Sequence, residues 1–302
     1  MNELDIKIIE WIQSLGNSFF DSIFKIITQL GAEMLVIGVV GLIYWCIDKK
    51  EGEKIGMIAF LSLSLTNIIK NIVGRPRPFE QSAKIIAKDT SILDKTLYKE
   101  GIIKSTSTSF PSGHSTLASS SFTGIALWIK KRWVYILLEI VILLVMFSRM
   151  YLGAHFLTDV LAGYLIGTIL SIVLYKLIDK VKNKYLFYLI IVIILTPIVF
   201  TSQLYASKPV DLYKMYGAIL GAFVASYIEN KFINFENTKV IWKKILRLLV
   251  GAGLVLLEKE GTKLLFPSFS GNLIFETIRY FLMLLVALAL VPLIFKKIKI
   301  FN

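Results

Sequence analysis

Residues 185–201 read YLFYLIIVIILTPIVFT, 17 consecutive residues without a charged side chain. A helix of roughly 17–25 apolar residues is long enough to cross a lipid bilayer. Because the hydrocarbon core offers no water to an exposed backbone, such a segment has to be helical. Its apolar residues are too continuous for the alternating pattern of a membrane β-barrel. This stretch therefore predicts a transmembrane helix.

Further apolar stretches of this kind occur on both sides of it. They lie at residues 32–47, 55–73, 112–129, 133–150, 156–176, 213–229, 240–257 and 273–295. Hydrophobic residues make up 56% of the 302-residue chain, and charged residues only 18%, which is below the share usual in soluble proteins. The sequence thus predicts an all-α, polytopic integral membrane helix bundle with about nine transmembrane helices.

The amino-terminal segment, residues 3–29, is less uniformly apolar. Its first half alternates isoleucines with charged side chains, a pattern typical of an amphipathic helix that lies at the membrane interface. Asn17 interrupts this pattern before a second apolar stretch at 19–27. We expect a short buried or re-entrant pair of helices here, and a further crossing is the alternative.

The net charge of +13 could indicate nucleic-acid binding, but its distribution favours another explanation. The lysines and arginines cluster in every second connection between spans. These clusters lie at residues 49–54, 130–132, 176–184, 239–247 and 296–299. Positive residues are typical of cytoplasmic loops and also attract anionic headgroups. The sequence therefore predicts a bilayer, and no nucleic acid, as the partner.

The longest polar segment is 74–111, and long loops in compact proteins are usually functional. Lys70 precedes it at the end of a predicted span, where an ammonium group is costly unless it faces a polar cavity. Arg77 lies between Pro76 and Pro78, which stop the helix and keep the chain extended. Taken alone, Lys70 could equally reach the lipid headgroups.

The chain has two histidines, and each lies in a polar cluster at the end of a predicted span. His114 follows Pro111, Ser112 and Gly113, a sequence that suits the start of a helix. Backbone N–H groups at a helix start, together with the helix dipole, form an anion site. An ordinary helix cap followed by an interfacial histidine is the alternative explanation.

The second histidine, His155, precedes Asp159 by four residues, so both side chains project from one face of a helix. A carboxylate at this spacing can accept a hydrogen bond from one imidazole nitrogen and leave the other with a free lone pair. Arg149 lies upstream, and Gly153 allows the backbone to turn between them. As a bare pattern this spacing is common by chance.

The predicted topology brings these clusters together. Spans 112–129 and 133–150 form a hairpin, which returns the chain to the membrane face on which residue 111 lies. The shared face is opposite the basic loops and hence extracytoplasmic. Cations, histidines, a carboxylate and helix-start amides on one face describe a pocket for a phosphoryl group. The residues expected there are Lys70, Arg77, Ser112, Gly113, His114, Arg149, His155 and Asp159.

In these motifs the chain resembles the type 2 phosphatidic acid phosphatase superfamily. The motifs are Lys70-x6-Arg77-Pro78, Pro111-Ser112-Gly113-His114 and Ser148-Arg149-x5-His155-x3-Asp159. The resemblance implies that His155 attacks phosphorus while Asp159 orients it, and that His114 protonates the leaving oxygen. Lys70, Arg77, Arg149, Ser112 and the Gly113 amide would hold the phosphate oxygens.

The resemblance further implies a phosphohistidine intermediate, no cofactor and no metal. It covers residues 1–180, the expected phosphatase core, and leaves 181–302 as a four-helix transmembrane extension of unknown role. The expected protein is a multi-pass enzyme of the bacterial cytoplasmic membrane that acts on a phosphorylated lipid. Undecaprenyl diphosphate is the first choice, followed by phosphatidylglycerophosphate or phosphatidate. The alternatives are a sugar-phosphate phosphatase of the glucose-6-phosphatase type and a non-enzymatic lipid-binding or transport protein.

Overall fold

The computed structural model describes residues 3–93, 98, 102–206, 209–298 and 300–301. Parts of the long polar loop, at 94–97 and 99–101, therefore lie outside the described residues. Contacts divide the chain into two compact units, each built from several stretches. Unit 1 comprises Met1–Val36, Leu65–Leu174 and Tyr205–Lys208, and unit 2 comprises Ile37–Ser64, Tyr175–Leu204 and Pro209–Asn302.

Unit 1 contains most of the helices that carry the sequence motifs. They are α1 (Glu3–Ser14), α2 (Ser18–Ile27), α5 (Pro78–Gln81), α7 (Gly113–Ile129), α8 (Arg132–Tyr151) and most of α9 (Leu157–Lys180). The end of α4 (Lys49–Val73) also belongs to it. The described residues form no strand beyond one isolated bridge, between Leu93 and Ser105.

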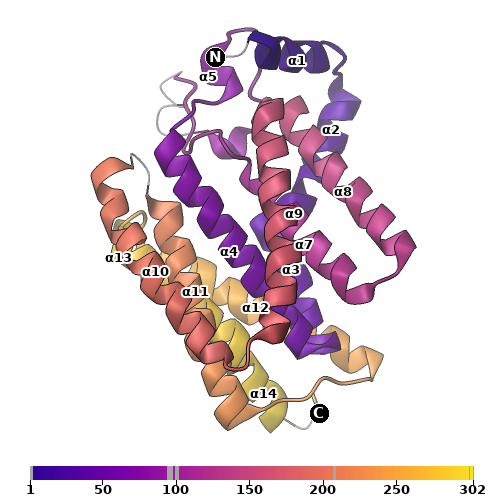
Figure 1. The fold of residues 1–302 in the computed structure, drawn as a ribbon, viewed down its shortest axis with the longest axis vertical. Helices are drawn as coiled ribbons and strands as arrows, with labels where there is room; N and C mark the ends of the chain where they lie inside the picture. Colours follow the sequence, from indigo (N-terminus) through magenta and orange to yellow (C-terminus); the bar gives the residue numbers. More distant parts are fainter. Residues whose placement is uncertain (1–2, 94–97, 99–101, 207–208, 299, 302) are drawn as a thin grey trace. The chain divides into compact units, whose positions relative to one another are not determined.

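Helices α7 and α8 form the predicted hairpin (Figure 1). Lys130 closes α7 in the left-handed conformation, with φ 57°. Two glycines of α9 allow this helix to approach α7 closely. A Cβ atom at Gly163 would meet the backbone of Ser112, and one at Gly167 would meet the side chain of Ser119. The close packing brings the start of α7 next to the start of α9.

The amino-terminal segment forms two helices separated at Asn17, as predicted. The Asn17 side chain accepts a hydrogen bond from Phe20 N and caps α2. Helix α1 runs across the end of α8 (Figure 1). It buries Ile9 and Ile12 and leaves Trp11 63% exposed, so α1 is amphipathic.

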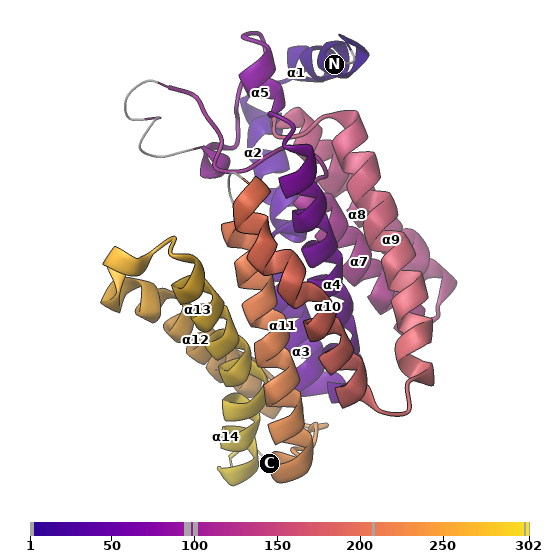
Figure 2. The same cartoon turned by 60° about the vertical axis from the view of Figure 1, so that its left-hand side comes forward.

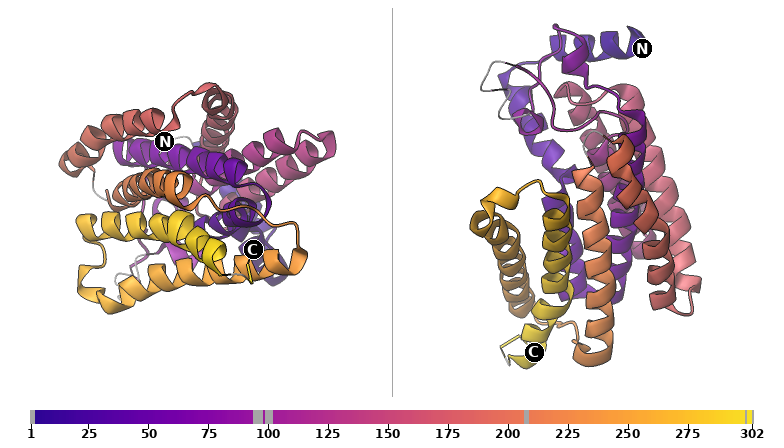
Figure 3. Two further views of the ribbon diagram at one scale, coloured as in Figure 1. Left: turned by 90° about the horizontal axis from the view of Figure 1, so that it is seen from below. Right: turned by 90° about the vertical axis from the view of Figure 1, so that its left-hand side faces the viewer.

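Unit 2 contains the remaining helices. They are the end of α3 (Glu33–Leu42), the start of α4, α10 (Lys184–Tyr205), α11 (Val210–Ile228), α12 (Ile241–Leu265), α13 (Leu273–Leu285) and α14 (Val291–Lys297). Helices α11 and α13 lie side by side (Figure 2), because Gly217 and Gly221 allow the α13 backbone to approach. Helices α12 and α13 form a second hairpin (Figure 3).

All nine predicted spans fall on helical segments. Among the described residues, five helices are long and apolar enough to cross a membrane. They are Lys49–Gln81, Arg132–Tyr151, Leu157–Lys180, Lys184–Tyr205 and Leu273–Lys297. The pair Ser18–Gly31 and Glu33–Ile47, bent by 51°, raises the number to six if it forms one broken span. A polytopic, all-helical membrane protein is therefore confirmed, while the count of nine stays a prediction.

Candidate active site

His155 lies in the turn between α8 and α9 and is 2% exposed. Gly153 takes a φ of +72°, which allows the predicted turn there. The two ring nitrogens of His155 face different groups. Nε2 lies 3.3 Å from Nη1 of Arg77. A guanidinium group can only donate, so Nε2 presents its lone pair and Nδ1 carries the proton of the neutral ring.

Asp159 lies at the start of α9, behind the Nδ1 side of the His155 ring. Its Oδ2 atom is 3.6 Å from Nδ1, a distance too long for a hydrogen bond. Oδ2 instead accepts from Ser109 Oγ at 2.5 Å and from Phe156 N at 2.8 Å. Ser109 Oγ itself lies 3.5 Å from Nδ1. The carboxylate and the Ser109 hydroxyl therefore face the same ring nitrogen together.

Arg77 is almost fully buried, and backbone and hydroxyl oxygens hold its guanidinium in place. Nη1 donates to Ala154 O at 2.9 Å, and Nε donates to Ser107 O at 3.0 Å. Lys70 lies nearby, and its Nζ atom donates to Thr108 O at 2.7 Å. Residues 107–109 thus contact both Arg77 and Lys70 and hold these two cations close to His155.

Arg149 is 1% exposed, in the last turn of α8. Its Nη1 atom donates to Thr28 Oγ1 and to Asp89 Oδ2, each at 2.8 Å. Its Nε atom is buried and has no hydrogen-bond partner in the described part of the chain. Burial raises the pKa of Asp89, but Arg149 and Ser91 outweigh it and keep this pKa below its usual value. Asp89 is therefore an ionised partner that fixes Arg149 at one end.

Ser112 occupies the position before the first residue of α7 and caps the helix. Its Oγ atom accepts from Ser115 N at 3.4 Å and from Ser115 Oγ at 3.0 Å, so neither bond uses its own proton. Ser112 N donates to Asp159 O at 3.0 Å, which joins the starts of α7 and α9. The first turn of α7 carries His114, which lies within electrostatic range of Arg149 and His155.

The electrostatics of this cluster favour a neutral His155. Burial has the largest effect, and the positive charges of Arg77, Lys70 and Arg149 add to it. Together they hold the pKa of His155 well below its usual range. At neutral pH the ring therefore keeps the lone pair that a nucleophile requires.

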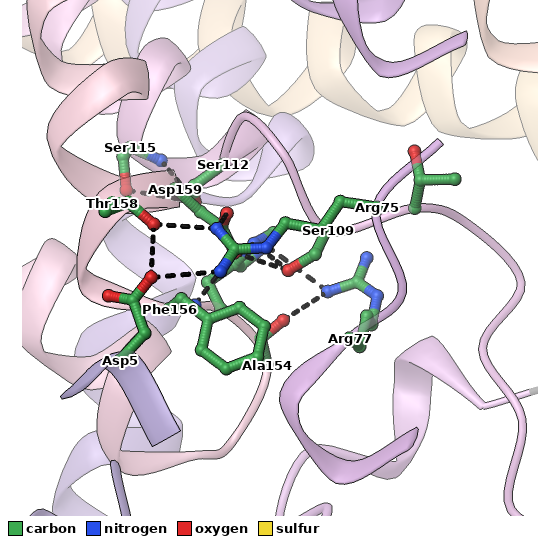
Figure 4. A network of polar contacts seen from close by, with 12 residues as sticks. Asp5, Arg75, Arg77, Ser109, Ser112, Ser115, Ala154, Phe156, Thr158 and Asp159 are labelled. Atoms are coloured by element: carbon green, nitrogen blue, oxygen red, sulfur yellow. Dashed lines mark hydrogen bonds and ion pairs between the residues drawn. The ribbon is translucent and has the colours of Figure 1, made fainter. Parts of the chain in front are cut away.

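The structure brings the predicted site residues together: Lys70, Arg77, Arg149 and His114 lie within electrostatic range of His155, and Ser112 contacts Asp159. Sequence reasoning missed several residues that contact them, among them Arg75, Asp89 and Ser109. Arg75 donates to Asp159 Oδ1 at 2.9 Å (Figure 4). Its place two residues before Arg77 was the available signal, whereas the serines and aspartates of the long loop offered none.

Comparison with known proteins gives matches along most of the chain. Residues 54–183 match the model of the PAP2 superfamily. Residues 213–302 match the model described as PAP2 superfamily phosphatase, transmembrane extension. No histidine or aspartate of the site lies in the second region.

Curated relatives include phosphatidylglycerophosphatase B of Bacillus subtilis, which is 37% identical over 27% of this chain and 45% of its own length. Sphingosine-1-phosphate phosphatase 1 of Rattus norvegicus is 30% identical over 52% of this chain and 34% of its own length. Undecaprenyl-diphosphatase of Sulfolobus acidocaldarius is 29% identical over 55% of this chain and 81% of its own length. The chain thus spans less than half of the first two relatives.

One solved structure is similar to part of the chain. It is the transmembrane PAP2-type phosphatidylglycerolphosphate phosphatase from Bacillus subtilis, with 25% identity and a TM-score of 0.45. The match covers 60% of this chain and 87% of that one.

Proposed function

Because the chain belongs to the type 2 phosphatidic acid phosphatase (PAP2) superfamily, we propose that it is a metal-independent phosphatase acting on a membrane lipid. The observation that carries the proposal is the environment of His155. Its Nε2 lone pair faces the Arg77 guanidinium, while Nδ1 faces Asp159 and Ser109. A site that only bound phosphate would need the cations, but not a buried histidine in one tautomer.

In the proposed reaction Nε2 of His155 attacks phosphorus, and the P–O bond to the leaving group breaks as the N–P bond forms. His114 gives its proton to the leaving oxygen. Water then attacks the phosphohistidine, losing a proton to His114, and the electrons of the N–P bond return to Nε2. Lys70, Arg77, Arg149, Ser112 and the Gly113 amide stabilise the charge on the phosphoryl oxygens.

The substrate that we favour is undecaprenyl diphosphate, followed by phosphatidylglycerophosphate or phosphatidate. The basic loops support a cytoplasmic location for the opposite ends of the helices, and hence a site that faces outward. An outward site suits a lipid carrier that is recycled on that side of a bacterial membrane. The relatives named for undecaprenyl diphosphate, phosphatidylglycerophosphate and sphingosine 1-phosphate support a lipid phosphate as the class.

We also propose that residues 1–180 form the phosphatase core and 181–302 an extension. In support, every proposed site residue lies before residue 160, and the transmembrane-extension match begins at residue 213. A lipid-binding or transport protein is the competing class, since the extension could act on its own.

Release of inorganic phosphate by the purified protein in detergent tests the proposal. The panel contains prenyl diphosphate, phosphatidylglycerophosphate, phosphatidate, sphingosine 1-phosphate and glucose 6-phosphate. We expect hydrolysis of at least one lipid that persists in excess chelator and disappears in His155→Ala. A glucose 6-phosphate preference would favour the sugar phosphatase. Binding of lipids without phosphate release by the wild type would favour the transport class.

A further inference from the structure

Arg75 is a cation that the proposed reaction does not use, yet it contacts the carboxylate behind the nucleophile. Its Nη1 atom donates to Asp159 Oδ1 at 2.9 Å and to Thr158 Oγ1 at 2.7 Å (Figure 4). Its guanidinium also lies 4.1 Å from the ring centroid of Phe156. Arg75 therefore contacts three residues of the segment that follows His155.

The backbone of Arg75 closes a ring of contacts around Asp159. Arg75 O accepts from Ser109 N at 2.7 Å, and Ser109 Oγ donates to Asp159 Oδ2 at 2.5 Å. Arg75 thus holds one carboxylate oxygen directly and positions the serine that holds the other. Both groups that face Nδ1 of His155 depend on this one residue.

The other end of the Arg75 guanidinium reaches helix α1. Nη2 donates to Asp5 Oδ2 at 2.9 Å, and the same oxygen accepts from Thr158 Oγ1 at 2.8 Å (Figure 4). Asp5 is only 3% exposed, although an aspartate on an amphipathic helix is ordinarily solvated. A buried carboxylate requires a partner, and Arg75 supplies the charge.

We propose that Arg75 is a positioning residue for the nucleophile His155, and that through Asp5 it makes the amino-terminal helix α1 part of the catalytic apparatus. The inference rests on the proposed function for its kinetic readout. Arg75 acts on the reaction through Asp159 and Ser109 and does not touch the phosphoryl group. The planar guanidinium of Arg75 suits this role because its N–H groups bind two carboxylates and a hydroxyl at fixed angles. The ammonium group of a lysine cannot do this.

Removing Arg75 has two consequences for His155. Asp159 and Ser109 lose the group that fixes them, so the ring leaves its attack geometry, and small misplacements cost up to about 100-fold in rate. In addition, the negative charge of Asp159 is no longer shared with a cation. The other charged groups around the ring, Arg77, Lys70 and Arg149, stay in place, as does the titratable ring of His114. The protonated imidazolium form of His155 is therefore stabilised, and the pKa of the His155 ring rises in Arg75→Ala.

The test compares four variants in detergent with the best lipid substrate. We expect Arg75→Ala to lower kcat about 30- to 100-fold while KM changes less than about threefold, because the cations that bind phosphate remain. Arg75→Lys should recover part of the loss, and Asp5→Ala should lower kcat about three- to tenfold. The double variant Asp5→Ala/Arg75→Ala should be no slower than Arg75→Ala, because Asp5 acts through Arg75. The matched control is Lys7→Ala on the same helix, whose ion pair with Glu3 is exposed, and it should match the wild type.

A purely structural role for Arg75 predicts a different pattern. In that case Arg75→Ala lowers thermal stability but leaves the kcat of the folded protein and its pH profile unchanged. The positioning role moves the acid limb of kcat/KM to higher pH in Arg75→Ala. Unchanged kcat and pH profile in Arg75→Ala, or multiplied losses in the double variant, would overturn the inference.

A readout independent of catalysis separates this inference from the proposed function. The chain has two histidines, so the ring nitrogens of ¹⁵N-histidine-labelled protein give two sets of NMR signals, which His114→Gln assigns. In Arg75→Ala the His155 ring should titrate at a higher pH than in the wild type. If the wild type releases no phosphate but this shift occurs, the function fails and the positioning role stands. If the enzyme is active and the shift does not occur, the positioning role fails alone.

Discussion

Nη1 of Arg77 lies 3.3 Å from Nε2 of His155 and donates to Ala154 O at 2.9 Å. The cation therefore contacts the atom that we assign as the nucleophile. In the proposed reaction, a phosphoryl group that approaches Nε2 meets the guanidinium at the same time, so attack and charge stabilisation would occur at one position. Burial of both side chains strengthens this electrostatic interaction relative to water.

Replacing Arg77 tests this arrangement. We expect Arg77→Ala to lower kcat on a lipid phosphate about 100- to 1,000-fold, because a charge aimed at the transition state is lost. Arg77→Lys should recover only part of the activity, since an ammonium group lacks the several planar N–H donors that bind Ser107 and Ala154 at the same time. Steady-state kinetics on monodisperse protein provides the measurement.

Arg132→Ala is the control for loss of an arginine, because Arg132 is exposed at the first residue of α8. It should keep wild-type activity. If Arg77→Ala keeps kcat within threefold of the wild type, Arg77 does not stabilise the transferring group.

The pH dependence of kcat/KM follows from the lowered pKa of His155. Burial and the nearby cations lower this pKa well below 6.5, so the ring is neutral and nucleophilic at neutral pH and stays so under mild acid. Activity is lost only when pH falls through the lowered pKa. Since kcat/KM reports the free enzyme, its acid limb should lie below pH 6.5. An acid limb at or above 6.5 in the wild type would contradict this environment.

Much of the fold could be predicted because apolar length and helix are linked in a membrane. The stretch 55–73 lies within α4, and 156–176 falls on α9 except for Phe156. Asn17 separates α1 from α2 as its pattern indicated. The number of crossings is harder to predict. Helix α7 has only 17 residues, and the helical pair Ser18–Gly31 and Glu33–Ile47 is bent by 51°. Length and hydropathy alone do not distinguish a short span from a buried helix.

The candidate site could be predicted where the residues lie close in sequence or at helix ends. The spacing of His155 and Asp159 predicted both on one face of a helix, but His155 lies in the turn before α9, which begins at Leu157. The Ser109 hydroxyl at 3.5 Å from His155 was not predictable from the spacing. Asp89 and Ser109 come from the long polar loop, in which many similar residues occur. Tertiary packing decides which serine or aspartate contacts a given arginine. This packing cannot be inferred from the neighbouring residues in the sequence.

The two histidines should differ in how they depend on the leaving group. An alkoxide leaving group needs a proton, whereas a nitrophenolate hardly does. General acid catalysis contributes about 10²- to 10⁴-fold, so His114→Ala should be severely impaired on an alkyl phosphate and partly active on nitrophenyl phosphate. His155→Ala should be inactive on both. Rates on the two substrates provide the measurement, and an equal loss in His114→Ala would mean that His114 mainly binds phosphate.

The proposed orientation can be tested by cysteine labelling in intact cells. The only native cysteine, Cys46, is buried and can be replaced by serine to give a clean background. In that background Lys84→Cys, in the long polar loop, should react with an impermeant maleimide from outside. Lys131→Cys, exposed in the α7–α8 connection, should react only after the membrane is opened. The reverse pattern would refute both the orientation and an outer-leaflet substrate.

Trapping the covalent intermediate tests the central claim most directly. The wild type is mixed with a ³²P-labelled lipid phosphate and quenched within milliseconds into alkali, which preserves phosphohistidine but not acyl phosphates. Peptide mapping then locates the label. We predict that the label lies on His155, is absent in His155→Ala, and accumulates in the wild type at a rate no slower than turnover. An intermediate that still forms in His155→Ala, or phosphate release by a wild type that never carries label, would contradict the account.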